Sequence, residues 1–473
     1  MRIFVKERSF YSKLLSIAIP TSLQSLITFT VNIADTVMVG SLGEYSIAGV
    51  ALANQFSFLY QITCFGIAGG MGVLTAQFWG KEDRDAMGAG LSIILKIAMA
   101  IGLLFMAVAA FFPSAIMSVY TTDPAVMIEG ASYLRWLSVS YLFVGLTTMM
   151  SSILRTAGVV KLTLLTNCVA LFLNISCNWI LIFGNLGAPR MGTAGAALAT
   201  TICRVVEFAI IAVFLFKIDD KIRFRLHMLL RWDKDIFRNY LKNGVPVIVS
   251  DVLLAVGNNM TSIVLGRMGA VVTSASSIAN TINQLTSVFL MGVANAAGII
   301  TGNTVGAGRY KQAKEYGKTF LALTVGVSIF SVCLILLIRS VIFRPFNIGG
   351  NIVKIFNVGE DTEKLAGQII YTLAGMSVFL TLSNILTKGI LRSGGDTKFL
   401  MLADVVFLWL VSIPLGFLTG LYLKWTPYIV YFFLRIDEVI KCVWCLFRFN
   451  SGKWIRNVAV RGEDLDNITA VKE

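Results

Sequence analysis

The sequence predicts an all-α integral membrane protein, with twelve transmembrane helices in two six-helix bundles related by a pseudo-two-fold axis along the membrane normal. Three observations lead to this class: an apolar composition, twelve long apolar runs and an internal duplication. Of the 473 residues, 56% are hydrophobic and only 14% are charged, and the mean hydropathy is +0.77. Soluble globular proteins are far less apolar, so the composition alone indicates a polytopic membrane protein.

Twelve apolar runs are long enough to cross a bilayer, which takes about 20 residues of helix. Their backbone polar groups must be satisfied internally, and the runs lack the two-residue period of a closed barrel, so we expect helices. The runs cover residues 14–39, 48–75, 88–112, 133–155, 162–184, 192–216, 245–266, 272–302, 319–339, 366–391, 399–421 and 425–446.

The net charge of +14 comes from Lys and Arg residues that lie mostly in the connections between these runs. They gather in the N-terminal segment, the even-numbered connections and the tail, whereas the odd-numbered connections hold few, such as Arg190 and Arg267. Such residues stay on the cytoplasmic side, beside anionic lipid. We therefore expect a multi-pass protein of the cell membrane with both termini in the cytoplasm, and no nucleic-acid partner.

The third observation is that residues 20–80 recur further along the chain. Pro20 recurs as Pro246, and the same shift, without a gap, pairs many identical residues. The pairs include Asn32 with Asn258, Gly40 with Gly266, Asn54 with Asn280, Gly72 with Gly298, and Gly80 with Gly306. Gly and Pro carry backbone and packing roles, so this agreement indicates a duplication.

The duplication predicts the domain organisation. We expect a six-helix lobe over residues 1–216, a basic cytoplasmic linker over 217–242, a second lobe over 243–446 and a cytoplasmic tail over 447–473. Because six is even, both copies enter the membrane in the same sense. Parallel repeats of this kind are typical of transporters, with the substrate site between the repeats.

Shorter repeated segments also pair charged residues that lie in the apolar runs. They pair Arg155 with Arg392, and they pair Arg204 and Glu207 with Arg435 and Glu438. We interpret Arg204 with Glu207, and Arg435 with Asp437 and Glu438, as structural charge pairs within helices. Lys388 and Asp404 are two further charges inside apolar runs and are candidates for a pair with each other.

Polar residues share one face of the first apolar helix. Gln24, Thr28, Asn32 and Asp35 are spaced by four, four and three positions, which places them on the same side of an α-helix. A carboxylate that faces lipid costs several kcal/mol, so this face is expected to point into the bundle or a wet cavity. Asp35 is a functional candidate by this reasoning; the alternative is a structural cap or an interhelical hydrogen bond.

The seventh helix has its own polar stripe, which holds Asp251, Asn258 and Ser262. Under the repeat Asp251 aligns with Ser25, and Asp35 aligns with Thr261. The two acids therefore lie at different depths and are not expected to form a carboxylate pair. Asp251 is a candidate for cation coupling, with packing or interhelical hydrogen bonding as the alternative.

The fifth and sixth helices supply uncharged oxygen atoms. Asn174 and Asn178 are four residues apart, and Thr200 ends a run of small residues. Their amides and hydroxyl could complete the oxygen shell of a small cation or hydrogen-bond Asp35. They could equally hold helices together.

Several motifs accompany the plan of six plus six helices. They are NIADTVMVG at 32–40, Gln77 with Gly80, LRTAG at 154–158, GAALAT at 195–200 and LRSGGDT at 391–397. Through this plan and these motifs the sequence resembles the multidrug and toxic compound extrusion family, the MATE transporters, over nearly its whole length. Each motif alone is weak, but together they are specific.

The resemblance implies secondary active export of an organic, often cationic, compound in exchange for protons or sodium ions. It implies that Asp35 binds the coupling ion with Asn174, and that the first helix bends at Pro20. Asn178 stands where one branch of the family has a second acid. Asp251 falls where another branch has a glutamate, but Thr381 replaces the second acid of that branch, so both ions stay open.

We therefore expect Asp35, Asn174, Asn178, Thr200 and Asp251 to bind the coupling cation. We assign Pro20, Gln24, Asn32 and Asn258 to the substrate cavity and its gating. We expect a monomer in the lipid bilayer that handles a small organic substrate, has no catalytic residues, and needs neither a metal nor a cofactor beyond the coupling ion.

Other function classes make different demands on the sequence. A lipid-linked precursor flippase of the same superfamily is the main alternative, but it would need additional helices and a cationic cavity for a pyrophosphate. A channel or receptor does not predict a duplication with an acid in each half. An enzyme would need a nucleophile with a base partner, a metal cluster or a phosphate loop, and the sequence offers none of these patterns.

Overall fold

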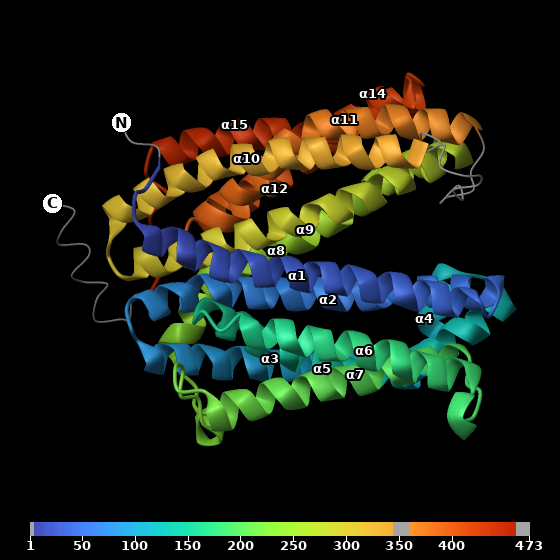
Figure 1. Ribbon diagram of the computed structural model, residues 1–473, viewed down its shortest axis with the longest axis horizontal. Helices are drawn as coiled ribbons and strands as arrows, with labels where there is room; N and C mark the ends of the chain where they lie inside the picture. Colours follow the sequence, from blue (N-terminus) through green and yellow to red (C-terminus); the bar gives the residue numbers. More distant parts are fainter. Residues whose placement is uncertain (1–3, 344–359, 460–473) are drawn as a thin grey trace. The chain divides into compact units, whose positions relative to one another are not determined.

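The computed structural model describes residues 4–343 and 360–459, and all regular secondary structure in these ranges is helical (Figure 1). The first half contains α1 (Arg8–Gly40), α2 (Glu44–Gly80), α3 (Arg84–Phe111), α4 (Pro113–Tyr120), α5 (Pro124–Thr156), α6 (Lys161–Phe183) and α7 (Thr193–Val213). The second contains α8 (Lys234–Arg267), α9 (Ala270–Gly306), α10 (Tyr310–Phe343), α11 (Glu360–Asn384), α12 (Thr397–Phe407), α13 (Ile413–Phe417), α14 (Pro427–Phe433) and α15 (Ile436–Asn450). The all-α class is confirmed.

Eleven helical segments of the described chain are long and apolar enough to cross a membrane, and they coincide with the first eleven predicted runs. The twelfth run, 425–446, was predicted as one helix but is divided into α14 and α15 at Leu434 and Arg435. Arg435 caps α15 with φ −120° and ψ 8°, outside the helical range. The division places a charged side chain at an interruption of an apolar run.

The eleventh predicted run is helical throughout, but its helix is widened in two places. It consists of α12, the π-helical turn η5 (Leu408–Ser412), α13 and a second π-helical turn, η6 (Leu418–Tyr422). Pro414 lies near the start of α13 and has no N–H to donate to the preceding turn. A third widened turn, η4 (Ile385–Leu391), follows α11.

Contacts between residues group the chain into two compact units. One unit holds Met1–Ser22 and Val249–Asn457, and the other holds Leu23–Ile248 and Val458–Glu473. The boundary between the two units therefore falls inside α1, after Ser22, and inside α8, after Ile248. Ser22 and Ile248 are equivalent positions in the internal repeat. A proline, Pro20 or Pro246, lies just before each division, where its ring weakens the helix. The lobe boundaries drawn from the sequence stay a prediction.

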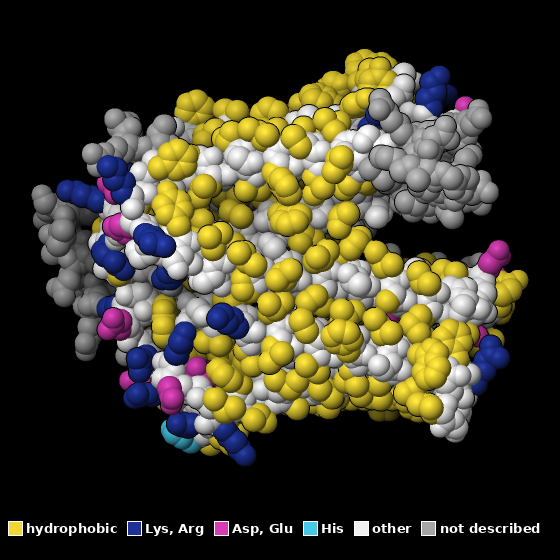
Figure 2. Space-filling model, in the orientation of Figure 1, with side chains coloured by type: hydrophobic (Ala, Val, Ile, Leu, Met, Phe, Trp, Pro, Cys, Tyr) yellow, Lys and Arg dark blue, Asp and Glu magenta, His cyan; other side chains and the backbone are white. Residues whose placement is uncertain are grey.

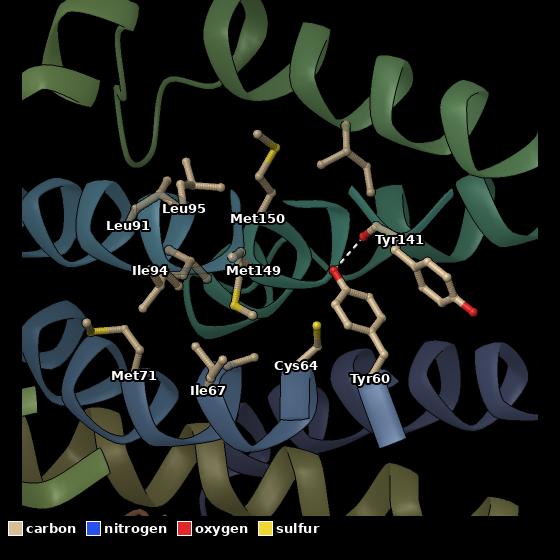
Figure 3. Packing of buried hydrophobic residues seen from close by; sticks show 14 of the residues in the cluster. Tyr60, Cys64, Ile67, Met71, Leu91, Ile94, Leu95, Tyr141, Met149 and Met150 are labelled. Atoms are coloured by element: carbon tan, nitrogen blue, oxygen red, sulfur yellow. Dashed lines mark hydrogen bonds between the residues drawn. The ribbon is translucent and has the colours of Figure 1, made fainter. Parts of the chain in front are cut away.

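The unit that contains α2 to α7 is built around α5, which packs against α2, α3 and α7 (Figure 1). Figure 3 shows part of its buried core, a cluster that includes Tyr60, Met71, Leu95, Tyr141 and Met149. The Tyr60 hydroxyl donates a hydrogen bond to the backbone carbonyl of Tyr141, and the two rings meet edge to face with centroids 5.1 Å apart. A buried phenol needs such a partner, so this bond positions α2 on α5.

The other unit packs α9, α10 and α11 together, with α14 and α15 against α11. The beginning of α1 is anchored here, because the ring of Phe10 lies 4.6 Å from that of Tyr316 and 5.2 Å from that of Phe320. The Tyr316 hydroxyl also donates to Glu7 Oε2 at 2.9 Å. These contacts hold the first turns of α1 on α10.

Large hydrophobic side chains are exposed along the lengths of the helices, and most Lys and Arg side chains lie near helix ends (Figure 2). This distribution would be unfavourable in water, because so much apolar surface is uncovered. It suits helices whose outer faces meet lipid. The chain is a multi-pass membrane protein.

Close contact between α2 and α8 gives a test of the packing. A Cβ added to Gly70 would lie 2.7 Å from the Cα of Gly244, so a larger side chain must push two backbones apart. We expect Gly70→Leu to destabilise the protein by about 1–3 kcal/mol, measured as a lower apparent melting temperature in detergent. The same change at Gly375, where a Cβ meets nothing within 4 Å, is the control. Equal effects at the two positions would contradict the packing.

Candidate functional site

The structure brings three of the predicted ion-binding residues together. Asn178 Nδ2 donates a hydrogen bond of 2.5 Å to Asp35 Oδ1 and one of 3.1 Å to Asn174 Oδ1. Asp35 lies on α1, and both asparagines lie on α6. We call these three residues the Asp35 cluster.

The local sequence explains how these side chains meet. Asn174 and Asn178 are one helical turn apart and therefore face the same way. They are 3% and 0% exposed, whereas Asp35 is half-buried. Burying two amides is favourable only if they find polar partners, and the carboxylate of Asp35 supplies one.

A charge pair that sequence reasoning treated as structural lies close to the cluster. Arg204 Nη1 contacts Glu207 Oε2 at 2.7 Å, which confirms the predicted pair within α7. Arg204 also interacts electrostatically with Asp35. Two carboxylates thus share one guanidinium, and the group keeps an excess negative charge.

The atoms of the cluster are of the type that binds a small cation. Asn178 Oδ1 is buried and, among the described residues, has no hydrogen-bond partner. Carboxylate and amide oxygens are ligands for hard cations, and a buried oxygen without a partner is unfavourable until it acquires one. A proton or a sodium ion at this place would balance the charge of Asp35.

Other predicted site residues are placed differently. Thr200 is half-buried on α7, and within the described part of the chain its hydroxyl makes no hydrogen bond to the Asp35 cluster. Gln24 is 6% exposed, but Asn32 and its repeat partner Asn258 are both exposed. The polar face of α1 is therefore buried at Gln24 and open at Asn32. Pro20 is buried inside α1.

Asp251 forms an ion pair that the sequence did not predict. Arg392 contacts its two carboxylate oxygens, with Nη2 at 3.1 Å from Oδ2 and Nη1 at 3.4 Å from Oδ1. The side chains are 19% and 16% exposed. Asp251 and Asp35 belong to different compact units, each of which has its own polar centre. The carboxylate of Asp251 is neutralised by an internal cation.

The suggested pair between Lys388 and Asp404 is wrong. Lys388 is exposed, and the cationic partner of Asp404 is Lys441, whose Nζ lies 3.4 Å from Asp404 Oδ1. Lys441 also contacts Glu438 Oε1 at 3.2 Å. Its partners lie on two helices, α12 and α15, so spacing along the chain could not reveal the bridge.

Comparison with known proteins identifies the family. A family model, MatE, matches residues 20–180 and 246–418, well over half of the chain. The chain belongs to the MATE family of transporters. The two matched segments begin at Pro20 and Pro246, which are also the first pair of residues in the internal duplication.

Curated relatives match this MATE protein over most of its length. An uncharacterized transporter, YisQ, from Bacillus subtilis is 23% identical and covers 89% of this chain and 90% of its own. A probable multidrug resistance protein, NorM, from Thermotoga maritima is 22% identical, and the match covers 95% of this chain and 94% of the relative. A probable multidrug resistance protein NorM from Bacillus licheniformis is 24% identical, and the match covers 88% of this chain and 89% of the relative.

Solved structures share the fold. A transporter of the MOP superfamily from Pyrococcus furiosus matches with a TM-score of 0.82, 18% identity and coverage of 93% of this chain and 96% of that one. A structure described as MATE in the bent conformation matches with a TM-score of 0.82, 18% identity and coverage of 94% and 96%. The likeness supports a MATE fold with twelve membrane helices.

The ion pair in this MATE protein can be tested by stability. Arg392→Met leaves the carboxylate of Asp251 without its internal cation and should cost about 3 kcal/mol. The double variant Arg392→Met with Asp251→Asn should recover most of the loss, because no unpaired charge then remains. Thermal unfolding in detergent compares the stability of these two variants, of the single variant Asp251→Asn and of the wild type. Additive effects of the two substitutions would show that the pair contributes nothing.

Proposed function

We propose that this MATE protein is a secondary active antiporter that exports organic, often cationic, compounds in exchange for protons or sodium ions. The observation that carries the proposal is the Asp35 cluster, in which a half-buried carboxylate and two buried amides meet inside the bundle. The curated relatives named multidrug resistance proteins support the choice of substrate class.

The proposed coupling begins with charge neutralisation at Asp35. Without a bound cation the cluster holds an excess negative charge, which the hydrogen bond from Asn178 offsets only in part. A proton or Na⁺ on the carboxylate competes with this bond and removes the charge. Two conformations that differ in how α1 packs then differ in cation affinity, and cation binding shifts their populations.

Pro20 gives α1 a place to change direction. It lies two residues before the point at which α1 passes from one compact unit to the other. Helix bending needs little energy where a backbone hydrogen bond is already missing. We assign to α1 the step that connects cation binding at Asp35 to the opening and closing of the substrate path.

The substrate would bind where polar side chains are exposed inside apolar helices. Asn32 on α1 and Asn258 on α8 are such residues, and they are equivalent under the repeat. An amide that faces lipid is unfavourable, so each is assigned to the substrate path on its own compact unit, as is Gln24 on α1. Access alternates between the cytoplasm, where we place both termini, and the outside of the cell.

Removing the charge of Asp35 should abolish coupled export. We expect Asp35→Asn to reduce efflux of ethidium or norfloxacin at least tenfold in a pump-deficient bacterial host, with pH and Na⁺ gradients imposed separately. Asp85→Asn is the matched control, because the side chain of Asp85 is 72% exposed. Unchanged transport by Asp35→Asn would refute the assignment. No export by the wild type, shown to be in the membrane, would favour a dedicated endogenous substrate or a lipid-linked precursor.

The hydrogen bond to Asp35 gives a finer prediction. Asn178→Ala removes both the donor and the orphaned amide oxygen, so a cation loses a ligand. We expect the cation concentration for half-maximal export to rise about tenfold, which corresponds to about 1.4 kcal/mol. Asn185→Ala is the control, since the amide of Asn185 caps Trp179 at the exposed end of α6. A change in maximal rate alone would place Asn178 outside the cation site.

A further inference from the structure

The segment that follows the last helix is bound to the rest of the protein at several points. α15 ends at Asn450, and the structure describes the chain as far as residue 459. Residues 452–459, with the sequence GKWIRNVA, form neither helix nor strand, and we call them the C-terminal strap. Most backbone polar groups of such a segment need partners outside it.

The first part of the strap is fixed by Trp454, which is 0% exposed. Its indole stacks on the ring of Phe449 with centroids 5.6 Å apart, and its Nε1 donates a hydrogen bond of 3.1 Å to the backbone carbonyl of Phe449. The ring also lies against Gly394 of the LRSGGDT motif, where an added Cβ would collide with it. A residue without a Cβ leaves room for the indole, so Gly394 forms part of its binding slot.

Arg456 adds polar contacts to the same end of the strap. Its backbone N–H donates to the carbonyl oxygen of Gly394 at 2.7 Å, and its Nη2 lies 3.3 Å from Asp396 Oδ1. Asp396 is 0% exposed and also pairs with Arg448, at 2.6 Å. All these contacts lie within the compact unit that ends at Asn457.

The other end of the strap is bound by side-chain amides of the second compact unit. The N–H of Val458 donates to Gln77 Oε1 at 2.7 Å, and Asn239 Nδ2 donates to the carbonyl oxygen of Val458 at 2.5 Å. Asn243 Nδ2 donates to Asn239 Oδ1 at 2.7 Å, which directs Nδ2 of Asn239 toward the strap. We call Gln77 and Asn239 the amide clamp.

The amide clamp recognises a peptide backbone. Both polar backbone groups of Val458 are bound, as in complexes where an extended peptide is held through its main chain. The side chains of Val458 and Ala459 are buried in the hydrophobic core of this unit. The clamp therefore accepts an extended segment with small apolar side chains, and it gives Gln77, a motif residue outside the Asp35 cluster, a defined partner.

The two attachments differ in strength. Trp454 is one of the largest fully buried side chains in the described chain, and Arg456 adds an ion pair. Val458 adds only two hydrogen bonds between neutral groups and the burial of a smaller side chain. A buried aromatic ring contributes more than neutral hydrogen bonds do. Release of the strap therefore begins at Val458.

The strap also joins the compact units, because the chain passes from one to the other between Asn457 and Val458. α1 and α8 make the same passage, but each has a proline just before it, where a helix bends easily. The strap has no proline, and only Asn457 separates Arg456 from Val458. Two residues of fully extended chain span roughly 7 Å. A strap bound at both ends therefore cannot lengthen.

We propose that the C-terminal strap is a latch, which stays anchored at Trp454 and docks reversibly through Val458 in the amide clamp. While Val458 is docked, the strap resists movement of one compact unit with respect to the other. When Val458 leaves the clamp, this restraint is lost. The role of the latch in slowing transport rests on the proposed antiport by alternating access, whereas the reversible docking does not.

Hydrogen exchange at single-amide resolution, on the full-length protein in lipid nanodiscs, tests the docking. In the wild type we expect the N–H groups of Arg456 and Val458 to be protected, with Val458 less protected because its end opens more often. Gln77→Ala should speed exchange at Val458 about tenfold, since one hydrogen bond is lost, and leave Arg456 unchanged. Gln55→Ala, at an exposed glutamine of the same helix, should change neither amide.

A variant within the strap tests the restraint on transport without altering the clamp. Val458→Pro removes the N–H that Gln77 binds and leaves the Trp454 anchor in place. We expect the initial rate of ethidium export to rise about threefold to tenfold at equal amounts of protein in the membrane, because docking is weakened. Val458→Ile keeps the N–H and the apolar contact and should export at the wild-type rate. Protection of the Arg456 amide in both variants verifies that the anchor holds.

Two results would overturn the proposal. One is exchange at Val458 that does not respond to Gln77→Ala, which would mean that the clamp does not hold the strap. The other is export by Val458→Pro that is no faster than export by the wild type, which would mean that the docked strap restrains nothing. Failure of the proposed antiport is seen separately, because the wild type would then export no dye while exchange at Val458 would still report docking.

Discussion

The requirement that a carboxylate inside a helical membrane bundle find a partner governs the polar interior of this protein. Asp35 accepts a hydrogen bond from Asn178, Asp251 pairs with Arg392, and Lys441 bridges two acids. These pairings differ in whether they balance the charge of the carboxylate completely. The Arg392 pair is complete, whereas the group at Asp35 keeps a surplus negative charge, because Asp35 and Glu207 share Arg204. A surplus charge of this kind favours the uptake of a cation.

The duplication preserved the backbone plan of the two halves and let their chemistry diverge. Pro20 and Pro246 keep equivalent places, and α1 and α8 are divided between the compact units at equivalent residues. The acids are not equivalent, because Asp35 corresponds to Thr261. A helix weakened by proline next to a charged group is thus common to both halves, but each half adds its own acid.

Much of the architecture could be predicted from the sequence, because the length and hydropathy of a single segment decide whether it can span the membrane. The same holds for Asn174 and Asn178, whose spacing along α6 places them on one face beside Asp35. Partners supplied by distant segments could not be found in this way. Arg392 and Lys441 meet acids more than thirty residues away, through helix packing that no spacing encodes. The break at Arg435 was also missed, because the surrounding residues are apolar enough for one helix.

The central claim is that cation binding in this protein drives the movement of an organic substrate in the opposite direction. Its most direct test measures both fluxes in the same proteoliposomes, with purified protein and one imposed gradient, first of H⁺ and then of Na⁺. The account predicts that one gradient drives substrate uphill while that ion moves the other way, with both fluxes starting and stopping together. Substrate movement at the same rate with either gradient or with none would contradict it.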